Sequence, residues 1–226
     1  MRLKKLLILC GVSAGLAGAA PLAFSNFDTN SEGWTVINNG ASVNPDYHAT
    51  GGNPGGYISD TDAASGPIWY FSAPAAFLGN KSAAVGGILS FNFRTTPGTF
   101  FDAPDIILIG GGLSLFASIK GLGENPNTFE PIVVEISNTQ EQVGWSTGDP
   151  NEDEGPTLQQ FQTVLGNLTA LRIRGELISG ADTASLDNVS LTASTATPEP
   201  ATFAISGLGL CAAGLYRRRQ RSVRSL

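Results

Sequence analysis

Short apolar runs bounded by glycine, proline and asparagine recur along the middle of the chain. In the clearest of them, Leu89, Phe91 and Phe93 alternate with polar residues, and Leu171 and Ile173 do the same further on. Such alternation is typical of a strand with one buried and one solvated face. We therefore expect eight strands, near residues 33–37, 68–71, 87–94, 105–109, 113–119, 131–136, 170–177 and 185–192. This spacing favours an all-β fold, a β-sandwich or jelly roll.

One segment, residues 157–165, has the spacing of an amphipathic helix instead. Thr157 and Gln160 form the pattern of a capping box at its start, and Gly166 is a typical stop signal after its end. Its apolar positions fall on one face, and they are Leu158, Phe161, Val164 and Leu165. We expect one short helix that covers the sandwich.

Charge divides the chain into three parts, which its formal net charge of −6 conceals. Residues 20–197 contain five basic and 18 acidic residues, a formal charge of −13, while eight further basic residues lie near the two ends. An acidic core without a basic stripe disfavours nucleic acid as a partner, because it repels phosphate. Cys10 and Cys211 both lie outside this core, so we expect no disulfide within it.

The first residues have the pattern of a secretory signal peptide. A basic start, residues 1–5, precedes an apolar run over residues 6–20 that ends in small residues suited to cleavage. Because Pro21 disfavours a cut directly before it, we expect signal peptidase to cleave after Ala19. The alternative is an uncleaved membrane helix.

A second apolar segment, residues 201–216, lies near the other end and is followed by Arg217, Arg218 and Arg219. A helix of 16 residues rises about 24 Å, less than the roughly 30 Å of a hydrocarbon core. Basic residues after such a segment keep that end in the cytoplasm. We therefore expect a short transmembrane helix that anchors the protein transiently, with the preceding residues at the outer face.

The order of motifs at this end resembles the PEP-CTERM sorting tail. Pro198, Glu199 and Pro200 are followed by the apolar segment and the arginines, in that order, over residues 197–221. The resemblance implies that an exosortase cuts near the Pro-Glu-Pro and passes the protein to the cell surface or the exopolysaccharide matrix. An ordinary C-terminal anchor, which would not be cleaved, is the alternative.

The core between the two ends resembles the laminin IV (laminin B) domain over residues 27–192. The motifs that carry this resemblance are Phe27-Asp28, Gly33-Trp34, the stretch from Gly51 to Ile58, Trp69-Tyr70-Phe71, the stretch from Gly86 to Phe91, Arg174-Gly175-Glu176 and the stretch from Leu186 to Val189. The family's usual tyrosine after Arg-Gly-Glu is Leu177 here. The resemblance implies a galactose-binding-like jelly-roll β-sandwich, an architecture shared with many carbohydrate-binding modules, and no catalytic residues.

No cofactor is required by these patterns, but two places have residues suited to structural calcium. Asp28 and Asp187 lie near the start and the end of the expected sandwich, where related carbohydrate-binding sandwiches hold Ca²⁺ through carboxylate and carbonyl oxygens. The alternative is that Asp187 and Asn188 satisfy backbone donors at a turn or bulge. The acidic stretch 149–155 partly matches a calcium loop, but its glycine comes one residue late and Gln160 occupies the last ligand position, which favours a solvated turn.

Other conspicuous residues favour structural roles. His48 is expected in a polar loop, because the sequence has no Gly-x-Ser-x-Gly motif to supply a nucleophile for it. Arg174 and Glu176 point to the same side of one predicted strand and favour an ion pair over catalysis. Glycines 110–112 predict a hairpin turn, not a phosphate-binding loop. The residues Trp34, Trp69 and Tyr70 favour the core over exposed sugar-stacking positions.

These patterns predict a non-enzymatic, exported surface or matrix protein, structural or adhesive, with exopolysaccharide as a candidate ligand at a site that the sequence does not locate. One alternative is a polysaccharide hydrolase, which needs two carboxylates converging in a cleft. The other is a coat subunit that binds no ligand. The expected organisation is a signal peptide (1–19), a lead-in (20–26), the sandwich (27–192), a linker (193–197), the sorting signal (198–221) with its transmembrane segment (201–216), and a basic tail (222–226).

Overall fold

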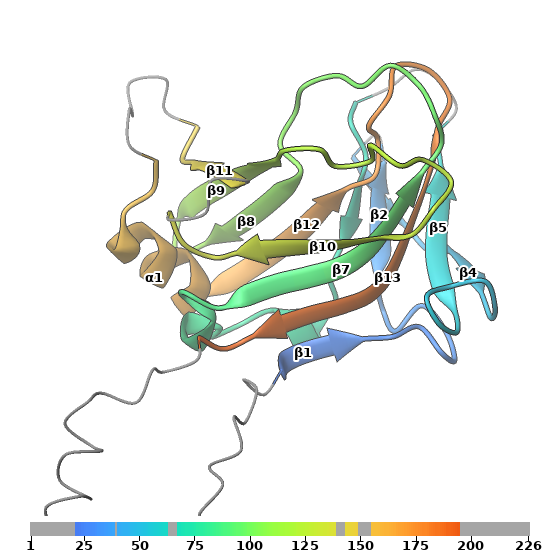
Figure 1. Ribbon diagram of the computed structural model, residues 1–226. Helices are drawn as coiled ribbons and strands as arrows, with labels where there is room; N and C mark the ends of the chain where they lie inside the picture. The colour runs from blue at the N-terminus through green and yellow to red at the C-terminus, as the bar shows by residue number, and fades with distance from the viewer. Residues whose placement is uncertain (1–20, 39, 63–66, 139–142, 149–154, 195–226) are drawn as a thin grey trace, which may run out of the picture. The chain divides into compact units, whose positions relative to one another are not determined.

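The structure, a computed structural model, describes residues 21–38, 40–62, 67–138, 143–148 and 155–194. Within these ranges the chain forms two antiparallel β-sheets that pack face to face, as Figure 1 shows. The all-β sandwich expected from the sequence is confirmed. The expected signal helix and the transmembrane segment 201–216 lie outside the described residues.

The first sheet has six strands, with β1 paired to β13 beside the main path. In order across the sheet the path is β10 (Glu130–Glu135), β7 (Ile88–Thr95), β13 (Thr183–Thr192), β5 (Tyr57–Thr61) and β4 (Asp46–His48), and β1 is Pro21–Ser25. On β7 the side chains of Leu89, Phe91 and Phe93 are buried while their neighbours face outward, as their alternation predicts.

The second sheet has seven strands. In order across the sheet these are β11 (Val143–Ser146), β9 (Leu113–Ile119), β8 (Ile106–Gly110), β12 (Leu168–Arg174), β6 (Tyr70–Ser72), β2 (Thr35–Asn38) and β3 (Ala41–Val43). Gly111 and Gly112 connect β8 and β9 with positive φ angles of 56° and 80°, which glycine adopts without strain. The predicted hairpin turn is confirmed.

One α-helix, α1 (Leu158–Gly166), covers the end of the second sheet near β8 and β9, and two short 3-10 helices, η1 (Ala75–Phe77) and η2 (Ser82–Ala84), join strands elsewhere. The predicted capping box is present, because the Thr157 side chain accepts from the backbone of Gln160 and the Gln160 side chain accepts from the backbone of Thr157. Phe161, Val164 and Leu165 are buried as predicted. Leu158 is 63% exposed, because it stands at the first helical position, beyond the surface that α1 covers.

Aromatic side chains fill the space between the sheets. Trp34 and Trp69 are fully buried and Tyr70 is nearly so, which confirms their predicted place in the core. Trp34 meets Phe77 edge to face at 5.3 Å between ring centroids, and Trp69 meets Phe71 in the same way at 5.1 Å. These three residues are therefore not exposed to stack on a ligand.

All eight predicted strands are present, 113–119 with the same boundaries as β9 and the others with shifted ones, and the described residues form five further strands that were not predicted. These are β1, β3, β4, β5 and β11, each of three to five residues. Segments this short carry little periodic signal, and partners distant in sequence fix them. Residues 20–26, expected as a lead-in, include β1, in which Ser25 lies opposite Val189 of β13.

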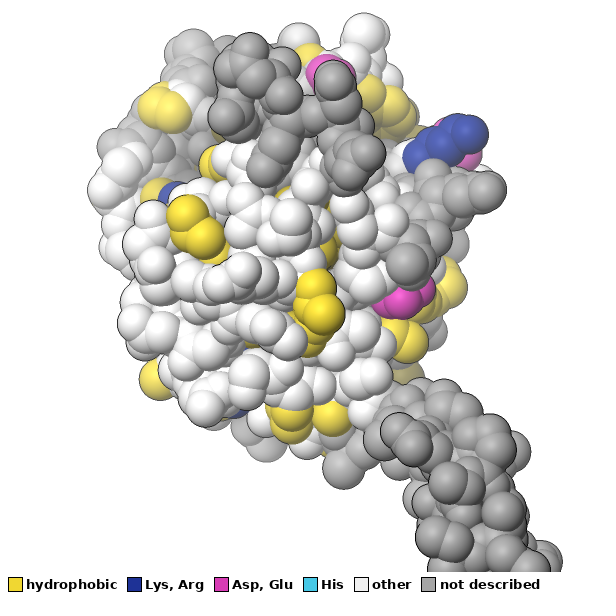
Figure 2. Space-filling model, turned by 90° about the vertical axis from the view of Figure 1, so that its left-hand side faces the viewer, with side chains coloured by type: hydrophobic (Ala, Val, Ile, Leu, Met, Phe, Trp, Pro, Cys, Tyr) yellow, Lys and Arg dark blue, Asp and Glu magenta, His cyan; other side chains and the backbone are white. Residues whose placement is uncertain are grey.

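On the side of the domain that carries α1 and β11, exposed apolar side chains lie in small separate groups, as Figure 2 shows. Isolated apolar residues are normal on the surface of a globular protein, whereas docking surfaces form large continuous patches. The hollows of the domain are the better candidates for a functional site.

Candidate functional site

A polar groove crosses β4, β5, β13 and β7 of the first sheet, on the face directed away from the core. The strand register places Asp46 opposite Ser59, Ser59 opposite Ser185, and Ser185 opposite Arg94. Four side chains from four strands thus form one row across the sheet. The groove has a volume of about 290 Å³, and its lining includes Thr61, Thr96, Asn127 and Thr183.

Arg94 is the one arginine or lysine in this lining. Its guanidinium carbon lies 4.8 Å from the centroid of the Tyr57 ring and 4.4 Å from that of Phe129, distances at which a cation is attracted to an aromatic ring. One terminal nitrogen donates a hydrogen bond to the Ser185 hydroxyl at 3.3 Å. Among the described residues, no carboxylate forms an ion pair with Arg94.

His48 lies on the other side of the Tyr57 ring. The two rings stack with centroids 4.4 Å apart and an interplanar angle of 11°, and the His48 Nε2 atom is 2.9 Å from the Ser59 hydroxyl. The prediction that His48 lies in a loop was wrong, since β4 includes it and pairs it with Tyr57 of β5. Its contacts give it a role in holding Tyr57 in place.

Asp28 and Asp187, the predicted calcium pair, lie at the same loop of residues 51–56. A Cβ atom on Gly55 would overlap the Asp28 carboxylate, and one on Gly52 would stand 2.7 Å from an oxygen of Asp187. Glycine at these two positions therefore lets the carboxylates approach the backbone closely. Burial raises the pKa of Asp187 above its usual value, hydrogen bonds to its carboxylate oppose this, and the nearby charge of Asp28 raises it further.

Both oxygens of Asp187 already accept backbone hydrogen bonds, at 2.6 Å from the Asn53 N–H and at 2.7 Å from the Asn188 N–H. The register of β13 shifts between Asp187 and Ser190, and Asn188 has a φ of 50°, which marks a bulge. Asp187 thus satisfies backbone donors at a bulge, as the alternative to a calcium ligand predicts. Oxygen ligands suit Ca²⁺, but two carboxylates leave most of its six to eight positions to carbonyl groups and water.

The part of the chain that the structure describes contains no group of three or more histidine, cysteine, aspartate or glutamate side chains arranged to hold a metal ion. Residues 149–154 of the acidic stretch lie outside the described residues.

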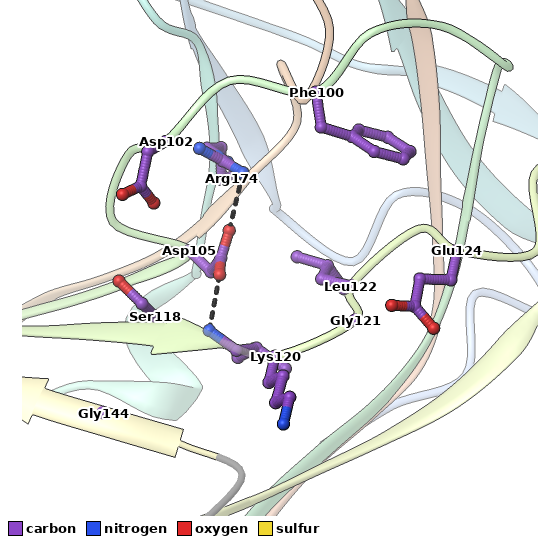
Figure 3. Close-up of a pocket in the computed structure, with 11 residues that line it drawn as sticks. Phe100, Asp102, Asp105, Ser118, Lys120, Gly121, Leu122, Glu124, Gly144 and Arg174 are labelled. Carbon is purple, nitrogen blue, oxygen red and sulfur yellow. Dashed lines mark hydrogen bonds and ion pairs between the residues drawn. The ribbon is translucent and has the colours of Figure 1, made fainter.

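A second hollow, of about 390 Å³, lies where β8 begins and where β9 and β12 end. Figure 3 shows Arg174 and Asp105 facing each other within it. Their side chains form an ion pair at 2.9 Å with both almost fully buried, and the Ile119 N–H donates to the other Asp105 oxygen at 2.6 Å. Burial raises the pKa of Asp105, while the charge of Arg174 and the Ile119 hydrogen bond oppose that shift.

The predicted pairing of Arg174 with Glu176 was wrong, because β12 ends at Arg174 and the ion pair is made to Asp105, which directly precedes β8. Glu176 lies instead near Asp62 and Asp182, whose charges add to its burial in raising its pKa. Sequence spacing cannot identify such a partner, since Asp105 precedes Arg174 by a long stretch of chain.

The acidic side chains of the second hollow do not converge. Asp102 and Glu124 lie on opposite sides of it in Figure 3, and Asp105 between them is occupied by Arg174 and a backbone donor. The paired carboxylates of a glycosidase lie close enough to act on one bond from its two sides. The hollow with the most carboxylates thus lacks the arrangement that the hydrolase alternative needs.

The sorting and cleavage residues predicted from the sequence lie outside the described residues. These are Ala19, Pro198, Glu199, Pro200, Arg217, Arg218 and Arg219. Within the described ranges, none of the helices has both the length and the apolar character needed to cross a membrane.

Sequence reasoning did not identify the groove. Arg94 stood out only as a polar residue on the solvated face of a predicted strand, and Tyr57 and Phe129 gave no signal. The available signal was the alternation on β7, which places Arg94 outward; the ring contacts depend on residues far apart in the chain.

Comparison with known proteins agrees with the motifs. The profile of laminin B (Domain IV) matches residues 70–204, and that of the PEP-CTERM protein-sorting motif matches residues 196–221. Laminin subunit gamma-1 of Xenopus tropicalis is 31% identical over 185 residues, which are 78% of this chain and 10% of that protein. Laminin subunit gamma-2 of Homo sapiens is 36% identical over 128 residues, 54% of this chain and 10% of that protein. The chain thus spans about a tenth of the length of these relatives.

Two solved structures share the fold at low sequence identity. The L4b domain of human laminin alpha-2 superposes with a TM-score of 0.58 at 13% identity, covering 76% of this chain and 97% of that domain. The carbohydrate-binding module CtCBM11 superposes with a TM-score of 0.50 at 13% identity, covering 80% of this chain and 99% of that module. The chain belongs to the laminin B (Domain IV) family and carries a PEP-CTERM protein-sorting motif at its C-terminal end.

Proposed function

We propose that this protein is processed by an exosortase and acts at the cell surface or in the extracellular matrix as a non-catalytic structural or adhesive module. The observation that carries this proposal is that a laminin B domain and a PEP-CTERM sorting motif follow each other on one chain. Laminin-like domains and sorting motifs together fit an exported, non-catalytic protein.

The proposed route has three steps. Signal peptidase cleaves after Ala19, the segment 201–216 holds the protein in the membrane for a time, and exosortase then cuts near Pro198–Pro200. In cells that contain exosortase, we expect the exported protein to begin at Ala20 and to lack residues 217–226 by intact-mass measurement. In cells without it, the protein should stay in the membrane fraction with residues 217–226 attached. An exported protein that retains those residues would contradict the proposed sorting.

We further propose that the domain binds polysaccharide. The support is its fold, shared with a carbohydrate-binding module, and the polar groove across the first sheet. A glycan screen with the full-length protein in detergent should give at least one polysaccharide ligand, without release of reducing ends. Release of reducing ends that depends on two carboxylates would favour the hydrolase alternative, and a screen without any ligand would favour a coat subunit.

We also propose that Asp28 and Asp187 hold a structural calcium ion at the 51–56 loop. Two observations support the proposal. Glycine at positions 52 and 55 leaves room for both carboxylates, and these carboxylates offer only oxygen atoms, the ligands that Ca²⁺ prefers. The melting temperature should rise with Ca²⁺ and fall with a chelator, and Asp28→Asn should abolish the difference. Asp102→Asn, the same change at an exposed position of the second hollow, away from the 51–56 loop, is the control. An unchanged melting temperature with chelator would count against the site.

A further inference from the structure

Arg94 of the groove has more donors than the fold uses. A guanidinium presents five N–H donors in a planar fork. The described residues supply one hydrogen-bond acceptor for them, the Ser185 hydroxyl at 3.3 Å. The half-exposed side chain is nevertheless held in place, because the rings of Tyr57 and Phe129 both lie within 5 Å of its guanidinium carbon. The groove thus contains a positioned cation with unused donors.

The Tyr57 ring is not a free platform for a sugar. His48 stacks on it from β4, and Arg94 lies over it from the side of β13 and β7, so the sheet order places these two groups on opposite sides of β5. Neutral sugars are commonly held by stacking on an open aromatic face. Here Arg94 and His48 occupy the two faces of the Tyr57 ring. The arrangement therefore favours an anionic group bound by Arg94 over a neutral sugar stacked on Tyr57.

The rest of the groove suits the hydroxyl groups of a saccharide. Ser59 and Ser185 are buried and bond to His48 and Arg94, so they form the floor of the groove. The hydroxyls of Thr61 and Thr183 lie 2.8 Å apart and line the groove, and a hydroxyl with one such partner still has capacity for a further hydrogen bond. Asp46 lies three strands from Arg94, about 14 Å away across the sheet at the usual strand spacing. The acid and the base are thus separated along the groove, with hydroxyl groups between them.

We propose that this groove binds a polysaccharide that carries carboxylates, a polyuronate, with the carboxylate of one sugar unit on Arg94 and its hydroxyls on Thr61 and Thr183. The proposal rests on the polysaccharide binding proposed above and names the class of ligand and its site. A carboxylate matches the guanidinium fork in two parallel hydrogen bonds, which a single hydroxyl cannot do. A hydrogen bond between charged groups typically corresponds to roughly tenfold or more in affinity.

General attraction does not explain such binding, because residues 20–197 carry a formal charge of −13. Polyanions are repelled by such a domain over distances up to a Debye length of about 8 Å at physiological salt. Recognition must therefore come from a local contact, and it should discriminate between anions of different shape.

The test compares polysaccharides that differ in charge and in the kind of anionic group, with one pair, polygalacturonate and its methyl ester, that differs mainly in charge. Full-length protein in detergent is titrated at 0.15 M NaCl with polygalacturonate, alginate, fully methyl-esterified polygalacturonate, dextran sulfate and neutral dextran. We expect binding to at least one of the two polyuronates, at least tenfold stronger than to the methyl ester or to dextran sulfate. Arg94→Met and Arg94→Lys should each weaken it at least tenfold. Lys120→Gln, which removes one exposed positive charge outside the groove, should leave it unchanged.

The variants' melting temperatures establish that they are folded, and Arg94→Lys keeps the charge and most of the packing if Arg94→Met does not fold. Equal binding of acid and methyl ester, equal binding of dextran sulfate, or wild-type binding by Arg94→Lys and Arg94→Met would each overturn the proposal. Binding of neutral dextran alone would overturn it and leave the proposed polysaccharide binding standing. Failure to bind either polyuronate would overturn it as well, and the glycan screen would then decide the broader proposal separately.

Discussion

Two arginines of this domain lie over aromatic rings but differ in burial and in the partners that the fold gives them. Arg174 is 5% exposed, its guanidinium carbon is 5.4 Å from the Phe101 ring centroid, and it pairs with buried Asp105. One of its nitrogens also donates to the carbonyls of Phe101 and Ala103, at 3.2 and 3.0 Å. Arg94 is half-buried and has one acceptor, the Ser185 hydroxyl.

The difference separates a structural cation from one available to a ligand. A buried charge is tolerated when the fold supplies a counter-charge and acceptors, and it then contributes to a unique arrangement of the chain. A positioned charge without such partners keeps its donors for another molecule. Each of the two hollows contains an arginine. We expect mutation at the buried pair in the second hollow to lower stability, and mutation of Arg94 in the groove to weaken ligand binding.

The largest effect is expected from breaking the buried pair. Asp105→Ala leaves the Arg174 guanidinium buried without its counter-charge, and such changes cost about 3–5 kcal/mol. Chemical denaturation should show this loss in the free energy of unfolding, whereas Lys120→Gln in the same hollow should change it by less than about 0.5 kcal/mol. A loss below about 1 kcal/mol for Asp105→Ala would mean that the pair is not structural.

A smaller loss of stability is expected from a change at Gly175, which follows Arg174 in the chain. A Cβ atom on Gly175 would overlap the ring of Trp69, which is fully buried and cannot move aside. Overpacking of this kind costs about 1–3 kcal/mol, so Gly175→Ala should lower the free energy of unfolding by that amount. Gly144→Ala, at a position with no atom within 4 Å of the added Cβ, is the matched control and should be neutral. Equal stability of the two variants would show that the Trp69 ring can shift.

The sequence was sufficient for the parts of the fold that depend on local pattern. The eight predicted segments form strands and the Thr157 capping box begins α1, because alternation and capping involve residues close in the chain. The resemblance to laminin B, carried by motifs distributed along the core, is confirmed by the family profile over residues 70–204.

The sites were less accessible to sequence reasoning because their residues meet across distant strands. Arg174 was expected to pair with Glu176, two positions away, and pairs with Asp105 on β8's side of the sheet. The groove joins Tyr57, Arg94 and Phe129, whose proximity depends on the order of strands in the sheet. No residue pattern specifies that order.

Acidification should stabilise the domain modestly between pH 7 and pH 4. Burial raises the pKa of Asp60, Glu176, Asp182 and Asp187 above their usual values of 3.8 for aspartate and 4.5 for glutamate, whereas Asp105 does not belong to this set because its protonation would remove the counter-charge of Arg174. A carboxyl group with a higher pKa in the folded protein binds its proton first in that state. Stability therefore increases as the pH falls through the folded pKa and levels off below the unfolded one.

The measurement is the melting temperature against pH in the presence of a chelator, so that bound cations do not mask the carboxylates. Asp60→Asn, at the partly exposed end of β5, should reduce the rise in melting temperature on acidification without changing the fold. A melting temperature that falls steadily from pH 7 would show that other carboxylates, with lowered pKa values, dominate.

The smallest effect on stability is expected from Arg94, where binding should change most. Its contacts with Tyr57 and Phe129 are those of a half-exposed cation on aromatic rings, worth about 0.5–1 kcal/mol. Arg94→Met keeps much of the apolar stem against these rings, so the free energy of unfolding should fall by no more than about 1 kcal/mol, while polyuronate affinity falls at least tenfold. A loss of stability as large as that of Asp105→Ala would remove the distinction between the two arginines, because both would then be structural. A small change in stability together with lost polyuronate binding would identify Arg94 as an arginine that serves a ligand and not the fold.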